Sequence, residues 1–148
     1  DGECHWVPEE GEAARELILT LTRDHGLGPA GIFLISPFRD CANRLARMAR
    51  DLGLDPKKTG TVHTTQGKEA DVVILVLGGD PKRPGAKDWA TKKPNLLNVA
   101  VSRAKKRLYV IGNAAEWGRR RFFREVATRL PVCDNEREAA CNTNSILC

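Results

Sequence analysis

The chain has 148 residues, with 24 Lys and Arg against 19 Asp and Glu, and a formal net charge of +5. This length supports one hydrophobic core, and 41% hydrophobic residues is ordinary for a globular domain. The sequence holds no apolar run of membrane-spanning length and its first residues lack a signal-peptide pattern, so we expect a cytoplasmic protein rather than a secreted, membrane or fibrous one.

The first third of the chain alternates helix-like and strand-like segments. Apolar residues recur at helical spacing over residues 9–25, which predicts a helix. The run over 32–35 is short, continuous and apolar, as in a strand that is buried on both faces. Ser36 is then expected to cap the N-terminus of a helix that has Pro37 at its first position and ends before Gly53.

The rest of the chain continues this alternation. It predicts a short strand over 61–64, the strongest strand signal over 72–77, a long exposed loop over 78–94, a helix over 96–104, a strand over 108–111 and a helix over 113–130. Strands that alternate with helices indicate an α/β fold, a mostly parallel sheet covered on both faces. Residues 132–148 lack the pattern, so we expect one domain over 1–131 and a C-terminal tail that is disordered or partly non-native.

Basic residues gather in one part of the sequence. Residues 82–124 contain thirteen Lys and Arg but only two acidic residues. Clustered cations of this kind are typical of proteins that bind nucleic acid through its phosphates. A solvated basic helix surface explains the same charge equally well.

The five cysteines follow no recognisable pairing. No C-x-x-C motif occurs, and no His lies near the last three cysteines, so the usual signature of a zinc site is missing. We expect reduced thiols and no metal site formed by these residues, which are Cys4, Cys41, Cys133, Cys141 and Cys148.

The phosphate loop expected of a nucleotide-binding α/β protein is absent. The motif G-x-x-x-x-G-K-[ST] has no match, because Gly67-Lys68 is followed by Glu69 and the upstream spacing to a glycine is wrong. No G-x-G-x-x-G follows a predicted strand either. We therefore expect that this domain does not cradle a triphosphate by itself.

Two long segments nevertheless carry a specific pattern. Residues 61–74 (TVHTTQGKEADVVI) and 95–112 (NLLNVAVSRAKKRLYVIG) resemble motifs V and VI of superfamily 1 helicases, and residues 35–39 (ISPFR) are similar to motif IV. The form H-x-x-Q-G-x-E-x-D is closer to the 5′-to-3′ branch, which includes RecD-like and Upf-like helicases. The resemblance covers residues 31–113 and implies a C-terminal RecA-like domain, a three-layer sandwich of the P-loop NTPase type without its own Walker A loop.

The resemblance implies that ATP and Mg²⁺ bind only together with the N-terminal RecA-like domain of the same protein. Arg103 would be the arginine finger that stabilises charge on the γ-phosphate; a surface Arg at a helix C-terminus is the alternative. Gln66 and Gly67 would face the nucleotide cleft, and Glu69 would contact the nucleotide or couple it to the bound strand, although turn chemistry alone explains the glycine. Arg39 is also assigned to the nucleotide, with a backbone-phosphate contact of the nucleic acid or a solvated surface position as alternatives.

Single-stranded DNA or RNA is the implied partner. A Ser can cap a helix, a Thr can follow from β-propensity and a lone His is commonly structural, so each assignment to the strand has a plain structural alternative. The residues assigned to nucleic acid are Ser36, His63, Thr64, Thr65, Lys92 and Lys93.

The function predicted from the sequence is that of a C-terminal motor domain in an ATP-dependent helicase or translocase. It would supply the arginine finger and part of the single-strand-binding surface, and the isolated chain would be inactive as an ATPase. The alternative is a non-catalytic, helicase-like module that binds nucleic acid or a partner protein through its basic residues 82–124.

Overall fold

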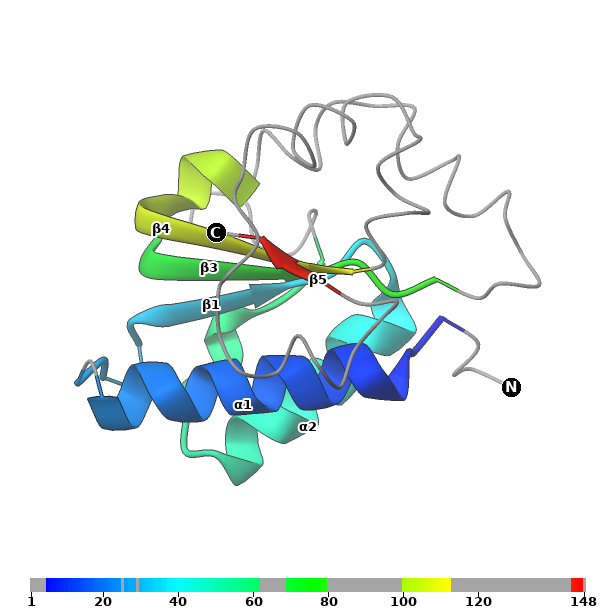
Figure 1. Ribbon diagram of the computed structural model, residues 1–148, viewed down its shortest axis with the longest axis horizontal. Coiled ribbons are helices and arrows are strands. Elements are labelled where there is room, and N and C mark those ends of the chain that lie inside the picture. Colours follow the sequence, from blue (N-terminus) through cyan, green and yellow to red (C-terminus); the bar gives the residue numbers. More distant parts are fainter. Residues whose placement is uncertain are drawn as a thin grey trace.

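The computed structural model describes residues 5–24, 26–28, 30–61, 69–79, 100–112 and 145–147. Residues 100–103 form a helical turn that leads directly into a strand (Figure 1). In chain order the elements are α1 (Pro8–Asp24), β1 (Ile32–Ile35), α2 (Arg39–Asp51), the 3₁₀ turn η1 (Pro56–Lys58), β2 (Thr59–Gly60), β3 (Ala70–Val76), β4 (Ala104–Gly112) and β5 (Ser145–Leu147).

The strands form one sheet in the order β2-β1-β3-β4-β5. The first four strands are parallel to their neighbours, and β5 pairs antiparallel with β4. In the centre of the sheet Ile32 of β1 lies beside Val72 of β3, and Val73 of β3 lies beside Leu108 of β4. The predicted α/β fold with a mostly parallel sheet is confirmed.

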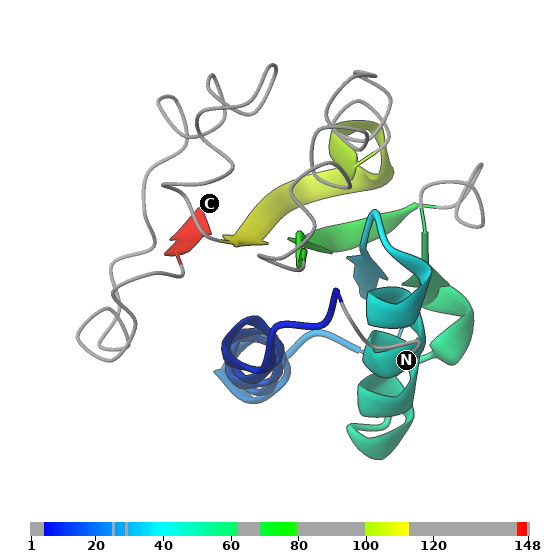
Figure 2. The ribbon, with the colours of Figure 1, turned by 90° about the vertical axis from the view of Figure 1, so that its right-hand side faces the viewer.

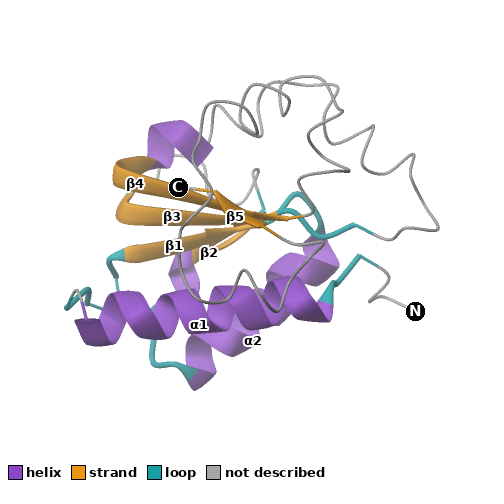
Figure 3. Cartoon of the chain, in the orientation of Figure 1, coloured by secondary structure: helices purple, strands orange, loops and turns teal. Residues whose placement is uncertain are grey.

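Alternate residues of each strand point to opposite faces of the sheet and supply two apolar clusters. Ile32 and Leu34 of β1 belong to the cluster that packs under both α1 and α2. Phe33 and Ile35 belong to the cluster on the other face, which includes Ala100 of the turn at 100–103. Figures 2 and 3 show the same arrangement, with α1 and α2 together on one side of the sheet and that turn on the other.

The predicted start of the second helix is wrong by two residues. α2 begins at Arg39, and its N-cap is Phe38, which has an extended backbone and no side-chain cap hydrogen bond. Ser36 does not cap the helix because its Oγ accepts a hydrogen bond from the Phe38 N–H at 3.3 Å and so closes a local turn. Pro37 lies inside this turn rather than at the first helical position.

Other element boundaries also differ from the prediction. β2 occupies only residues 59–60, before the strand predicted at 61–64, and β4 begins at Ala104, where the sequence predicts the end of a helix. β5 lies within the predicted tail. The helix predicted at 113–130, and most of the loop predicted at 78–94, lie outside the described residues.

Candidate functional site at the two edges of the sheet

The described candidate residues lie at two opposite edges of the parallel sheet. Glu69 and Arg103 come directly before the starts of β3 and β4, at the amino edge. Ser36 and Arg39 follow the end of β1, at the carboxyl edge. A seven-residue strand such as β3 separates these edges by roughly 20 Å, at about 3.3 Å per residue. Arg39 is therefore placed away from Arg103, and the three described residues assigned to the nucleotide do not share one location.

The strand register brings Glu69 and Arg103 to neighbouring positions. Ala70 and Ala104 are partners in the parallel β3–β4 ladder, so the residues that precede them start adjacent strands. Glu69 is held from two directions: Lys58 Nζ donates to its carbonyl oxygen at 2.6 Å, and Lys105 Nζ lies 3.7 Å from its carboxylate. Parallel pairing thus joins two segments that the sequence separates by more than thirty residues.

β4 contains a bulge immediately after Arg103. Three steps along β4, from Ala104 to Arg107, match two steps along β3. Because of the extra residue, the consecutive Lys105 and Lys106 form ion pairs with Glu69 and Asp71, respectively. The Lys106 Nζ lies 3.6 Å from the Asp71 carboxylate. Bulges bend a strand and change the direction of nearby side chains, and they are frequent beside functional sites.

Charge and an apolar side chain lie together on the amino edge. Arg103 is half-buried, whereas the Val101 side chain two residues earlier is 58% exposed. Farther along β4, Arg107 donates a hydrogen bond to the Tyr109 hydroxyl at 3.0 Å, and this bond raises the pKa of the Arg107 guanidinium. The exposed valine suits a surface that meets another protein domain.

The carboxyl edge is built partly from the N-terminal segment, which the sequence did not single out. The backbone N–H of His5 donates to Asp40 Oδ2 at 2.8 Å, and its carbonyl accepts from Gly79 N–H at 2.8 Å and from the Cys41 thiol at 3.0 Å. Glu10, only 2% exposed, accepts a hydrogen bond from Gly78 N–H at 3.0 Å. These bonds fasten residues 5–10 to the end of β3 and the start of α2 (Figure 1).

Aromatic rings stack at the same edge. The imidazole of His5 lies parallel to the Phe38 ring, with centroids 4.1 Å apart and an interplanar angle of 11°. Phe38 is 6% exposed and Ser36 is fully buried, whereas Arg39 is exposed. The Ser36 hydroxyl therefore orients the turn before α2 and does not cap the helix, and its assignment to the nucleic acid stays a prediction.

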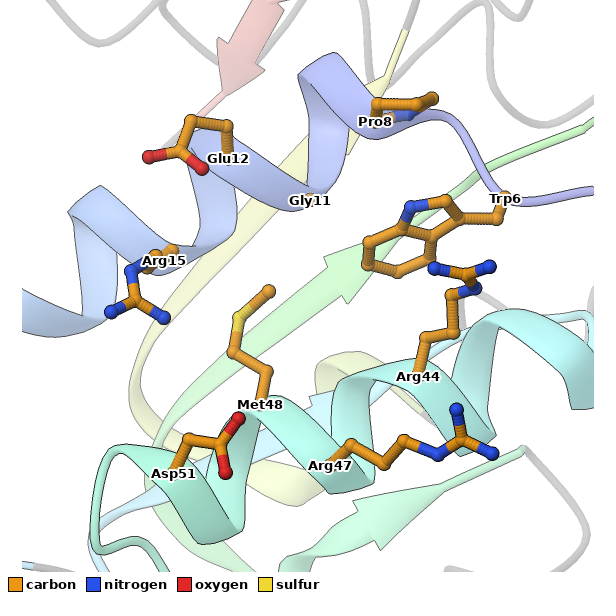
Figure 4. Close-up of a pocket in the computed structure, with 9 residues that line it drawn as sticks. All are labelled: Trp6, Pro8, Gly11, Glu12, Arg15, Arg44, Arg47, Met48 and Asp51. Atoms are coloured by element: carbon orange, nitrogen blue, oxygen red, sulfur yellow. The ribbon is translucent and has the colours of Figure 1, made fainter.

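A cavity of about 350 Å³ lies between α1 and α2 on the outer side of these helices (Figure 4). Trp6 stands at one end, packed against Gly11, and the Arg44 guanidinium carbon lies 5.5 Å from the centroid of its ring. Both contacts hold Trp6 in place, and with it the segment that carries His5. The lining residues are Trp6, Pro8, Gly11, Glu12, Arg15, Arg44, Arg47, Met48 and Asp51.

Several predicted site residues have no described position. Across the described ranges, no three His, Cys, Asp or Glu residues are grouped so that they could hold a metal ion. No helix in the same ranges is long and apolar enough to cross a membrane. The candidates outside the described residues are His63, Thr64, Thr65, Gln66, Gly67, Lys92 and Lys93.

Comparison with known families identifies the domain. A family model described as an AAA domain matches residues 4–115, about three quarters of the chain. The chain belongs to this family. A search among curated proteins found no match. This AAA domain occurs in the C-terminal regions of superfamily 1 helicases, which makes the protein helicase-like and points to an ATPase motor domain.

The matched residues include all the described strands except β5. They also include the N-terminal segment with His5, both edges of the AAA domain and the β4 bulge. Sequence reasoning missed His5 and Glu10 because neither belongs to a helicase-like motif. The only local signal was the pair Gly78-Gly79 directly after the strongest strand, where both glycines adopt positive φ.

Proposed function

We propose that the chain is the C-terminal motor domain of an ATP-dependent helicase or translocase of superfamily 1, from the 5′-to-3′ branch. The family match over residues 4–115 supports an ATPase motor. The observation that carries the finer proposal is the β3–β4 register, which brings Glu69 and Arg103 to the same edge of the sheet. The resemblance to motifs V and VI implies that Glu69 and Arg103 act at the same nucleotide.

The amino edge suits a phosphate ligand. Lys58, Arg103, Lys105 and Lys106 all lie near this edge. Of the acidic groups paired with Lys105 and Lys106, Glu69 is exposed and Asp71 is partly exposed. Arg103 would approach the γ-phosphate of ATP that is held by the N-terminal RecA-like domain, and so stabilise charge in the transition state. The described residues offer no clustered carboxylates for Mg²⁺, so the metal would be held by that other domain.

The carboxyl edge suits a single strand of DNA or RNA. Ligands of open α/β sheets bind beyond the carboxyl ends of the strands. Arg39 is exposed there, and we assign it to the strand's phosphates rather than to the nucleotide, because Arg103 lies at the other edge. His63, Thr64, Thr65, Lys92 and Lys93 remain proposed contacts of the strand, and Gln66 and Gly67 proposed contacts of the nucleotide.

The test compares ATP hydrolysis in the protein that contains this domain together with the N-terminal RecA-like domain. Arg103→Ala should lower kcat by about 10³-fold or more while ATP affinity changes little, as for other arginine fingers. Arg23→Ala is the matched control, because Arg23 is an exposed arginine in the last turn of α1. Equal losses of ATP affinity and kcat would instead make Arg103 a ground-state ligand.

The alternative function gives a different result. A non-catalytic module would bind single strands through its basic residues 82–124, thirteen cations against two acids, and Arg103→Ala would leave any ATPase activity unchanged. Strand binding by the full chain, measured at increasing salt concentration, tests the part that both functions share. Affinity that does not depend on salt would contradict both.

A further inference from the structure

The side chain of Lys58 connects two strands that the sheet itself keeps apart. Lys58 ends the turn η1 and directly precedes β2, whereas Glu69 directly precedes β3. β1 lies between β2 and β3, so these two strands are not neighbours in the sheet. Lys58 Nζ nevertheless donates a hydrogen bond to the Glu69 carbonyl oxygen at 2.6 Å. The side chain therefore crosses over β1 and ties the start of β3 to the start of β2.

A buried ring of β1 fixes the lysine on this path. Lys58 Nζ lies 5.7 Å from the centroid of the Phe33 ring, and Phe33 is fully buried. A cation at this distance from an aromatic ring is attracted to it. The ammonium is thus held between the Phe33 ring and the Glu69 carbonyl, and it fixes in turn the peptide group between Glu69 and Ala70, from which β3 starts.

The carboxylate of Glu69 is held less firmly than its main chain. Lys105 Nζ lies 3.7 Å from this carboxylate, and the Lys105 and Glu69 side chains are 57% and 58% exposed. An exposed ion pair contributes little free energy, so a bound ligand can replace Lys105 at little cost. Lys58 therefore fixes where Glu69 starts β3, next to the residue that starts β4, and leaves its carboxylate able to exchange partners.

We propose that Lys58 is a positioning residue, which sets the main chain of Glu69 so that the Glu69 carboxylate meets the nucleotide. This inference rests on the proposed function, because it assumes that a nucleotide binds at the amino edge. A group that works on a ligand has to be held within about 0.5 Å of its working position by supporting contacts. Lys58 supplies such a contact from outside the segments that resemble helicase motifs, and it does not itself touch the nucleotide.

The experiment measures ATP hydrolysis by the protein that contains this domain together with the N-terminal RecA-like domain. Lys58→Met removes the donor and keeps a side chain of similar length. It should lower kcat/KM for ATP about 10-fold, less than the roughly 10²-fold cost of a 1 Å displacement of a working group. Lys58→Arg keeps a cationic donor and should restore most of the activity. Arg50→Met is the matched control, because it removes an exposed cation from the last turn of α2, and it should change nothing.

A double variant separates positioning from plain stabilisation of the sheet. Glu69→Gln should lower kcat/KM by itself, and Lys58→Met added to it should cause no further loss, because Lys58 acts through the Glu69 carboxylate. A lysine that only stabilises the sheet would give losses that multiply. All assays are run below the melting transition of every variant, and if Lys58→Met melts too early, Lys58→Gln, whose donor stops short of the Glu69 carbonyl, takes its place.

The outcomes also separate this inference from the proposed function. Losses that multiply, or a kcat/KM that Lys58→Met leaves unchanged, would overturn the positioning role of Lys58, and a loss of kcat in Arg103→Ala would still support the motor domain. Absence of ATP hydrolysis by the unmodified two-domain protein would reject both.

Discussion

The substitution Gly78→Ala tests how the carboxyl edge is held together. Gly78 has φ of +63°, and an added Cβ would lie 2.7 Å from the His5 carbonyl oxygen and 2.7 Å from Cys41 Sγ. The left-handed backbone costs about 1–2 kcal/mol for a residue with a side chain. Overpacking against main-chain atoms adds about 1–3 kcal/mol. We therefore expect Gly78→Ala to lower the free energy of unfolding by about 2–5 kcal/mol.

Urea denaturation of the full chain, followed by circular dichroism, measures this change. Gly53→Ala is the matched control, because Gly53 has φ of +77° and an added Cβ there would have no atom within 4 Å. It should show only the backbone cost, about 1–2 kcal/mol. Equal losses for Gly78→Ala and Gly53→Ala would refute the close packing of residues 5–10 against the end of β3.

Three further changes probe the parts of the domain around this edge. Gly11→Ala would overlap the Trp6 ring and should lower the free energy of unfolding by about 1–3 kcal/mol in the same urea assay; an unchanged midpoint would contradict the packing of Trp6. Glu10→Ala leaves the Gly78 N–H unsatisfied and should lower the free energy of unfolding by about 1–3 kcal/mol. Glu10→Gln keeps an acceptor oxygen and should recover most of this stability, so equal losses for the two variants would reject the bond. Phe33→Ala leaves a cavity at a fully buried position and should lower the free energy of unfolding, measured by thermal melting, by about 3–5 kcal/mol. A loss below about 1 kcal/mol would show that Phe33 does not lie in the hydrophobic core.

The parallel core could be predicted because its strands carry their own signal. The run 32–35 is apolar throughout, and β1 has the predicted bounds. The start of α2 could not be predicted in this way, since Ser36 had two possible partners. Its hydroxyl bonds the Phe38 N–H two residues on rather than the first turn of a helix, and only the packed structure decides between these bonds.

The candidate site was predictable where sequence motifs coincide with strand ends. Glu69 and Arg103 lie together because each directly precedes one of two paired parallel strands. The resemblance groups Arg39 with them, although its position after β1 implies the opposite edge. His5 carried no signal, because its role arises from contacts with residues that are 35 or more positions away in the chain.

The fastening of residues 5–10 to the end of β3 also has a kinetic consequence. The bond between Glu10 and Gly78 closes a separation of 68 residues, whereas α1 and α2 form through local contacts. Contacts of such long range are made late, since the intervening chain must be ordered before they are gained. Amide exchange at Gly78 and Gly79 should therefore report a local opening that precedes global unfolding. The edge on which we place the single strand would be the last part of the sheet to close during folding and among the first to open afterwards.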